Sequence, residues 1–325
     1  MSIYFISSTL IILIMQHVVL IEARPQVCTK FVVTGATGAL GSSLCHHIVD
    51  QSIESTSTTD LLLGYRSESR LRQTLVQLQQ RMEGKESQEK VKITPFYCDL
   101  TTGTRIEKTM MDLNIKMCSV PVGSSVDVHE HIILVNNAAN CLRSSSPQVL
   151  RQSLDVNAIF PYQLARSVLL HADCNQETTV TIVNISSQDG ELSRLHSDLA
   201  EHIRRLNSQK EWENFVNRER DAWRGSDFEY AFGETPLYSF SKAVFTTATK
   251  ILSRDVAGRE GRRVVAMCPG NVLSQMSTEE EKTSAVSPVT ASELVLRVAS
   301  DETGQYRNGE FCRVNDKNMI ECDKL

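Results

Sequence analysis

The sequence has no excess of positive charge, which excludes one large class of function. Its 34 lysines and arginines are outnumbered by 39 aspartates and glutamates, so the formal net charge is −5 at pH 7. No broad basic surface is therefore available for nucleic acid. With 41% apolar and 22% charged residues, the chain also lacks the composition of a disordered tail, a collagen-like fibre or a small disulfide scaffold.

The chain also lacks any Cys-x-x-Cys pair, although it contains nine cysteines. The usual sequence signatures of zinc sites and thioredoxin-type redox sites are thus absent, and we predict no metal site. Because Cys98 and Cys268 fall at the ends of predicted buried strands, we expect free thiols in a reducing compartment.

The longest uncharged stretch lies at the amino terminus, where residues 3–21 contain no Asp, Glu, Lys or Arg. As a helix this stretch would span about 28 Å, close to the thickness of a membrane core. No basic residue precedes it, which disfavours a cleaved signal peptide. We predict that residues 1–24 form a signal anchor or targeting segment, placing the following domain on the cytosolic side of the endoplasmic reticulum or another endomembrane. The alternatives are an apolar extension packed on the domain, and a cytoplasmic protein.

From residue 29 onward, short apolar runs alternate with stretches of helical periodicity. Such runs, separated by helices, predict a parallel sheet covered on both faces, that is, an α/β doubly wound fold of about seven strands. The domain is expected to cover residues 29–325. The expected strands lie at residues 30–33, 61–63, 91–96, 131–135, 180–185, 263–267 and 309–314.

Residues 188–237 interrupt this alternation. Leu192, Leu195, Leu199, Ile203 and Leu206 recur at helical spacing and predict one amphipathic helix face. We therefore expect a helical insertion packed on the main domain.

A glycine-rich turn follows the first expected strand and opens the first expected helix. It reads Thr34-Gly35-Ala36-Thr37-Gly38-Ala39-Leu40-Gly41. Glycines at such a turn allow close approach of a pyrophosphate to the helix N-terminus, so the turn predicts dinucleotide binding.

The second expected strand ends without the acidic residue that usually binds the ribose hydroxyls of NAD. Arg66 stands there instead. Because arginine pairs with a 2′-phosphate, we predict NADP(H) as the cofactor; the alternative is an ordinary exposed arginine, with Arg70 and Arg72 beside it on a solvated helix.

Polar motifs lie where other strands end. Asn136-Asn137-Ala138-Ala139 ends the fourth strand, Ser186-Ser187 the fifth and Pro269-Gly270 the sixth, and Tyr238 and Lys242 follow the insertion four residues apart. In open α/β sheets ligands bind at this edge. The Tyr-x-x-x-Lys motif is weak evidence alone, but the ordered set resembles the short-chain dehydrogenase/reductase family over residues 29–315.

The resemblance implies a catalytic tetrad of Asn157, Ser187, Tyr238 and Lys242. In it Tyr238 would exchange a proton with the substrate oxygen, Lys242 would lower the pKa of Tyr238, and Asn157 would hold a water that links Lys242 to solvent. The resemblance and the turn together imply cofactor contacts from Gly35, Thr37, Gly38, Leu40, Gly41, Arg66, Asp99, Asn137, Ala138, Tyr238, Lys242, Pro269, Gly270 and Val272.

The chain departs from the common family pattern in three places. The middle glycine of the turn comes one residue early, as Gly38, and Ala139 replaces a usual glycine. The long segment between Ser187 and Tyr238 resembles that of the monomeric carbonyl reductases, which implies a monomer.

From these expectations we predict that the protein is an NADPH-dependent enzyme that reduces a small-molecule ketone or aldehyde. The alternatives are a membrane-associated retinol- or steroid-type dehydrogenase and a non-catalytic NADP(H)-binding scaffold or redox sensor. The segment 270–287, which contains Glu279, Glu280 and Glu281, is expected to form a lid over the site.

Overall fold

One eight-stranded sheet forms the centre of the protein. The computed structural model describes residues 26–84, 88–101, 108–109, 111–113, 128–173, 178–224, 230–275, 277–315 and 317–325. The strand order across the sheet is β3-β2-β1-β4-β5-β6-β7-β8. The strands are β1 (Gln26–Val33), β2 (Thr58–Tyr65), β3 (Val91–Tyr97), β4 (Val128–Asn136), β5 (Thr179–Ile185), β6 (Arg262–Cys268), β7 (Glu310–Val314) and β8 (Ile320–Lys324).

The sheet confirms the expected doubly wound fold and adds one strand to it. Strands β1 to β7 pair in parallel, whereas β8 pairs antiparallel with β7 at the edge. The additional strand was not predicted because it is short and largely polar, so it lacks the apolar run of a buried strand. The chain order reverses between β1 and β4, and the carboxyl ends of these two strands are where such sheets bind ligands.

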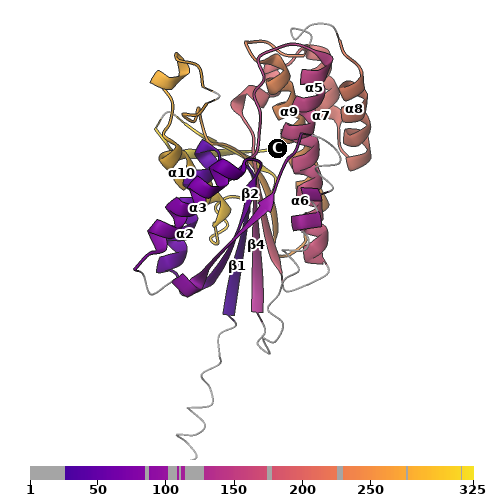
Figure 1. Ribbon diagram of the computed structural model, residues 1–325. Coiled ribbons are helices and arrows are strands. Elements are labelled where there is room, and N and C mark those ends of the chain that lie inside the picture. Colours follow the sequence, from indigo (N-terminus) through magenta and orange to yellow (C-terminus); the bar gives the residue numbers. More distant parts are fainter. Residues whose placement is uncertain are drawn as a thin grey trace, which may run out of the picture.

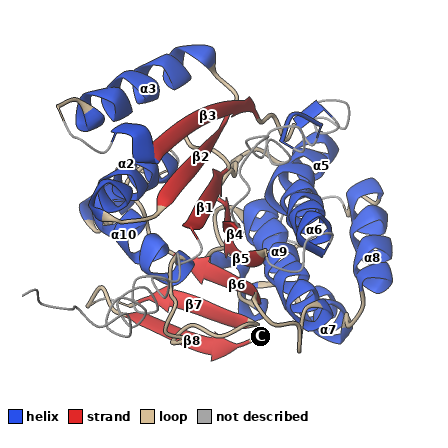
Figure 2. Ribbon diagram, turned by 90° about the horizontal axis from the view of Figure 1, so that it is seen from below, coloured by secondary structure: helices blue, strands red, loops and turns tan. Residues whose placement is uncertain are grey.

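Helices cover both faces of the sheet (Figures 1 and 2). One layer contains α2 (Ala39–Glu54), α3 (Glu68–Met82) and α10 (Pro288–Ala299), and the other contains α5 (Pro147–Leu154), α6 (Phe160–Asp173) and α9 (Pro236–Asp255). Side chains of β1 alternate between the two resulting cores: Val32 joins one, and Phe31 and Val33 join the other. This alternation follows from the period of two along a strand.

The segment expected to be a helical insertion contains α7 (Ser197–Arg205) and α8 (Gln209–Asp221). The helix is shorter than its leucine pattern predicts, because Leu195 pairs with Ala231 in a short antiparallel bridge before α7 begins. On α8, the buried Trp212 donates a hydrogen bond from Nε1 to the Val244 carbonyl of α9 at 3.0 Å. A capping box of Ser208 and Glu211 begins that helix.

The expectation that the cysteines are free thiols is wrong for one pair. Cys312 and Cys322 form a disulfide that joins β7 to β8. These residues lie directly opposite each other in the antiparallel ladder, with their Cα atoms 4.1 Å apart. The sequence could not indicate the pair because β8 itself was not predicted. Cys28, Cys45, Cys98, Cys141 and Cys268 are free.

Within the ranges given above, the structure contains no helix that is both long and apolar enough to cross a membrane. The predicted anchor at residues 3–21 lies outside the described residues, as do most of the residues between β3 and β4.

Candidate active site

A cavity of about 890 Å³ opens at the carboxyl ends of the central strands. Its walls come from the glycine-rich turn, the ends of β4, β5 and β6, the first turns of α9 and the segment after β6. Most of the predicted site residues line it: Gly35, Thr37, Gly38, Leu40, Arg66, Asn137, Ala138, Ser187, Tyr238, Lys242, Pro269, Gly270 and Val272. Gly41, Asp99 and Asn157 are not among the lining residues.

The glycine-rich turn approaches β4 too closely for larger residues. Gly35 has φ +63°, and a Cβ there would lie 2.9 Å from the Ala138 Cα. A Cβ at Gly41 would lie 2.2 Å from the Gly35 carbonyl oxygen, so this glycine serves the packing of α2 against the turn. Helix α2 begins after Gly38 with no side-chain cap and no acidic residue in its first turn. Its N-terminal amides are therefore suited to a phosphate.

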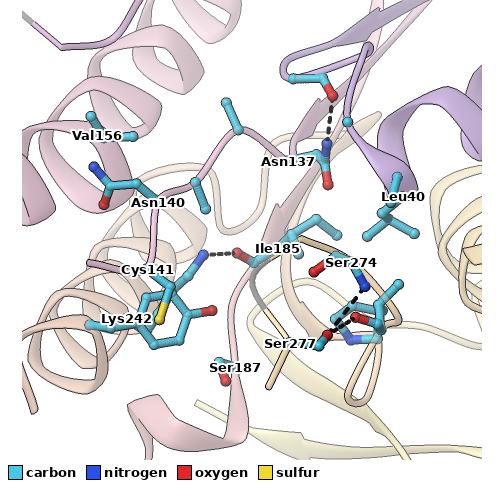
Figure 3. A pocket seen from close by; sticks show the side chains of 18 of the residues that line it. Leu40, Asn137, Asn140, Cys141, Val156, Ile185, Ser187, Lys242, Ser274 and Ser277 are labelled. Carbon is cyan, nitrogen blue, oxygen red and sulfur yellow. Dashed lines mark hydrogen bonds between the residues drawn. The ribbon is translucent and has the colours of Figure 1, made fainter. Parts of the chain in front are cut away.

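Asn137 joins the turn to the end of β4. Its Nδ2 donates to the Gly35 carbonyl at 3.2 Å (Figure 3). The same Nδ2 donates to the Thr34 carbonyl at 3.0 Å, and the backbone N–H of Asn137 donates to the Thr34 Oγ1 at 2.9 Å. These bonds fix the glycine-rich turn against the segment that follows β4.

Two arginines from the start of α3 and the preceding turn line one end of the cavity. Arg66 is exposed and carries the charge expected for a 2′-phosphate. Arg70 also lines the cavity, and its Nη2 donates to Gln275 Oε1 at 3.0 Å. Arg72 does not line it, and all three arginines are exposed.

Asp99 was expected to contact the cofactor, but its carboxylate is bonded within the protein. It accepts hydrogen bonds from the Tyr97 hydroxyl at 3.2 Å and from the Thr101 hydroxyl at 2.7 Å, and the residue is 1% exposed. Its neighbours Cys98, Leu100 and Thr101 line the cavity instead.

Ser187, Tyr238 and Lys242 converge on the cavity from β5 and α9. Lys242 is buried, and its Nζ donates to the Ile185 carbonyl at 2.7 Å (Figure 3) and lies 5.7 Å from the ring centroid of Tyr238. Burial lowers the pKa of Lys242 to about 8. Burial raises the pKa of Tyr238 above its usual value, and a hydrogen bond with Ser187 opposes this rise. Tyr238 is therefore protonated near neutral pH.

The two adjacent serines face different surroundings. Ser186 is 3% exposed, and its hydroxyl is 2.5 Å from the Thr246 hydroxyl. Ser187 follows β5 and caps the next turn. Both serines line the cavity, but the Ser186 hydroxyl is bonded to α9.

Asn157 lies in a π-helical turn, η2 (Asp155–Ile159), between α5 and α6. Its amide donates to the Asn140 carbonyl and to the Ser241 hydroxyl, each at 2.9 Å, and its Oδ1 accepts from the Asn140 N–H at 2.8 Å. Both amide hydrogens are used, so the side chain connects the segment after β4 to α9 and does not line the cavity. The water-holding role implied by the resemblance stays a prediction.

Five charged residues also line the cavity, and of these only Glu281 lies in a segment that was expected near the site. Arg143 lies 3.3 Å from Glu234 and 3.9 Å from Glu281, and Arg194 lies 3.7 Å from Asp189. Asp189 could have been predicted as a site residue from the sequence, because it comes two residues after Ser187. The other four come from separate loops, and their meeting is not encoded in any local pattern.

The residues present fit a dinucleotide. The open N-terminus of α2, the close approach permitted at Gly35 and the two arginines match a pyrophosphate and an adenosine phosphate. The fold is of the doubly wound α/β class, and its cavity has the shape and residues that suit a dinucleotide.

Comparison with known proteins supports this class and refines it. A family model described as polysaccharide biosynthesis protein matches residues 31–138, from β1 to just past β4. No curated protein matches the chain in sequence. Among solved structures, salutaridine reductase from Papaver somniferum is 16% identical with a TM-score of 0.64, over 88% of this chain and 99% of that one.

Two further solved structures are similar. The NADPH-bound carbonyl reductase from chicken fatty liver is 17% identical with a TM-score of 0.58, over 91% of this chain and 99% of that one. An NAD-bound 3-oxoacyl-[acyl-carrier protein] reductase from Brucella melitensis is 14% identical with a TM-score of 0.59, over 97% of this chain and 96% of that one. The chain has the fold of the short-chain dehydrogenases/reductases.

Proposed function

We propose that this protein is an NADP(H)-dependent oxidoreductase that reduces a small ketone or aldehyde to an alcohol. The main support for the proposal is that Ser187, Tyr238 and Lys242 line one cavity, next to the glycine-rich turn. The likeness in fold to a carbonyl reductase and to salutaridine reductase supports it.

Tyr238, Ser187 and Lys242 each have a separate role in the proposed reaction. The nicotinamide, when bound, supplies a hydride to the carbonyl carbon. Tyr238 donates the proton that the carbonyl oxygen takes up, and its buried position keeps that proton on the hydroxyl until the reaction. Ser187 donates a hydrogen bond to the same oxygen. Lys242, once protonated, stabilises the tyrosinate that remains.

Arg66 supports NADP(H) over NAD(H). A guanidinium at the end of β2 pairs with a 2′-phosphate, whereas an acidic residue there would repel it. Arg70 adds a second positive charge at the same end of the cavity. Similar structures bind either cofactor, one NADPH and another NAD, so this choice rests on the arginines of this chain.

A membrane-associated retinol- or steroid-type dehydrogenase is the second candidate. The uncharged stretch at residues 3–21 favours it, since such a segment would hold the domain at an endomembrane, facing the cytosol. The charged side chains around the cavity opening favour a more polar substrate.

A screen of ketones and aldehydes with NADPH oxidation as the readout tests the proposal. We expect turnover with at least one class of carbonyl compound. Retinal and 3-ketosteroids belong in the panel, because turnover of these alone would favour the second candidate. If the protein binds NADPH but reduces no member of the panel, it is a non-catalytic scaffold or sensor and the proposal is wrong.

A further inference from the structure

Asp189 lies next to the reacting groups, on a tight turn after β5. The turn, η3 (Gln188–Gly190), has Ser187 as its N-terminal cap. Ser187 Oγ accepts a hydrogen bond from the Asp189 N–H at 3.1 Å and donates one to Asp189 Oδ2 at 3.3 Å. The rotamer of the serine and the direction of its proton are thus both set by Asp189.

Gly190 fixes this turn against the helix that carries Tyr238 and Lys242. A Cβ at Gly190 would lie 2.7 Å from the Lys242 carbonyl carbon and 2.8 Å from the Ala243 nitrogen. The backbone of the turn is therefore in direct contact with α9 one helical turn after Tyr238. Asp189 consequently keeps a constant position relative to the tyrosine.

The carboxylate of Asp189 faces the cavity. Asp189 lines it, its side chain is 43% exposed, and its nearest cation, Arg194, is 3.7 Å away. Arg194 is itself 52% exposed, so solvent weakens the pair and leaves much of the negative charge of Asp189 uncompensated.

Several groups from different elements lie near Tyr238 or influence its pKa. They are Lys242 on α9, Cys141 after β4, Cys268 at the end of β6, and Ser187 and Asp189 after β5. Both thiols have raised pKa values because they are buried, so they are neutral near pH 7. Asp189 is then the anion among these groups, and an anion there raises the pKa of Tyr238 further.

We propose that Asp189 is a positioning residue that acts through Ser187 and Tyr238 and makes this site a proton donor. Its backbone N–H holds the Ser187 Oγ in place, and its carboxylate accepts the Ser187 proton until a carbonyl oxygen replaces it as the acceptor. Its charge keeps the proton on Tyr238 over a wider pH range. A tyrosine that keeps its proton over a wider pH range favours the direction of the reaction in which the carbonyl compound is reduced. The inference rests on the proposed function and adds a residue that the Ser, Tyr and Lys motifs do not contain.

The test compares pH profiles of wild type, Asp189→Asn, Asp189→Glu and Glu191→Gln. Asn keeps the size and backbone of Asp189 but removes the charge, whereas Glu keeps the charge. Glu191→Gln is the matched control, because Glu191 is a neighbouring carboxylate that pairs with Arg313 at 3.7 Å and does not line the cavity. The measurement is kcat/KM for alcohol oxidation and for carbonyl reduction against pH, together with NADPH affinity.

We expect Asp189→Asn to move the midpoint of the pH profile for oxidation to lower pH by about half a unit or more. The kcat/KM for reduction should then begin to fall at a lower pH than in the wild type. Asp189→Glu and Glu191→Gln should keep the wild-type midpoint, and NADPH affinity should not change. An unchanged midpoint in Asp189→Asn, or an equal shift in Glu191→Gln, would overturn the proposal.

A second readout separates this inference from the proposed reaction. In the NADP⁺ complex, the part of the tyrosinate absorbance that is lost in the Tyr238→Phe variant belongs to Tyr238. Its change with pH reports the titration of Tyr238 without any turnover. Measured in the wild type and in the Asp189→Asn variant, that titration should again shift to lower pH when the charge is removed. If no carbonyl compound is reduced, the proposed function fails, and this titration still decides for or against Asp189.

Discussion

At the scale of single residues, the site depends on how burial changes the acidity of two side chains. Tyr238 has a raised pKa and Lys242 has a pKa lowered to about 8, both chiefly because burial disfavours their charged forms. The protonated tyrosine is the acid that carbonyl reduction needs. The lysine then loses its charge more easily than a surface lysine, so its state depends on pH within the range in which enzymes are assayed.

Tyr238→Phe tests the acid directly. The substitution removes only the hydroxyl, so we expect turnover to fall by about 100-fold or more while NADPH affinity stays within about twofold of wild type. NADPH oxidation and a fluorescence titration of NADPH provide the two measurements. Substantial remaining turnover would mean that another group donates the proton.

Arg66→Asp tests the cofactor preference. Replacing a cation with an anion should remove the attraction for a 2′-phosphate and create a partner for ribose hydroxyls, so the ratio of NADPH to NADH affinity should fall by about tenfold or more. Arg72→Asp is the matched control, because it makes the same charge change on α3 at a residue that does not line the cavity. Equal effects of the two substitutions would show that Arg66 has no specific role.

At the scale of elements, the segment after β6 crosses the cavity opening and is tied on both sides. The backbone of Leu273 donates to Val286, and that of Val286 donates to Asn271, which closes the segment into a loop. Side chains then connect the loop to Arg70 through Gln275 and to Arg143 through Glu281. The expected lid over residues 270–287 stays a prediction.

Hydrogen exchange tests the lid. We expect NADPH to increase the protection of residues 271–286, and Arg143→Gln to reduce that protection by about two- to fivefold, because exposed ion pairs contribute up to about 1 kcal/mol. Arg204→Gln removes a similar exposed pair with Glu201 on α7 and should leave the segment unchanged. Identical protection of residues 271–286 with and without NADPH would refute the lid.

At the scale of the whole molecule, α7 and α8 lie outside the helix layer of α5, α6 and α9 (Figure 2). Trp212 of α8 is 1% exposed, and its ring centroid is 4.4 Å from that of Tyr162 on α6. At one edge of the sheet, strand β8 exposes Glu321, Asp323 and Lys324. Charges on an edge strand oppose pairing with a second sheet.

We therefore expect the protein to be a monomer. Light scattering after size-exclusion chromatography should give a mass near the 36.4 kDa of the chain across a range of concentrations. A dimer that persists on dilution would show that neither the outer helices nor β8 blocks association.

The alternation of strands and helices, the glycine-rich turn and the serine, tyrosine and lysine of the site could all be predicted from the sequence. These features can be predicted because they depend on local periodicity and on short motifs at strand ends, where the backbone geometry restricts which residues fit. The same reasoning predicted the burial of Leu199 and Ile203 but overestimated their helix, since the pairing of Leu195 with Ala231 is a contact between distant segments.

Only the tertiary structure decided which of the matching residues face the cavity. Asp99 and Asn157 are turned to partners within the protein, and Arg143 meets Glu234 and Glu281 from two other segments. The Cys312–Cys322 pair likewise required β8 to pair with β7. In each case the outcome depends on contacts between segments far apart in the chain, and no local pattern of residues specifies such contacts.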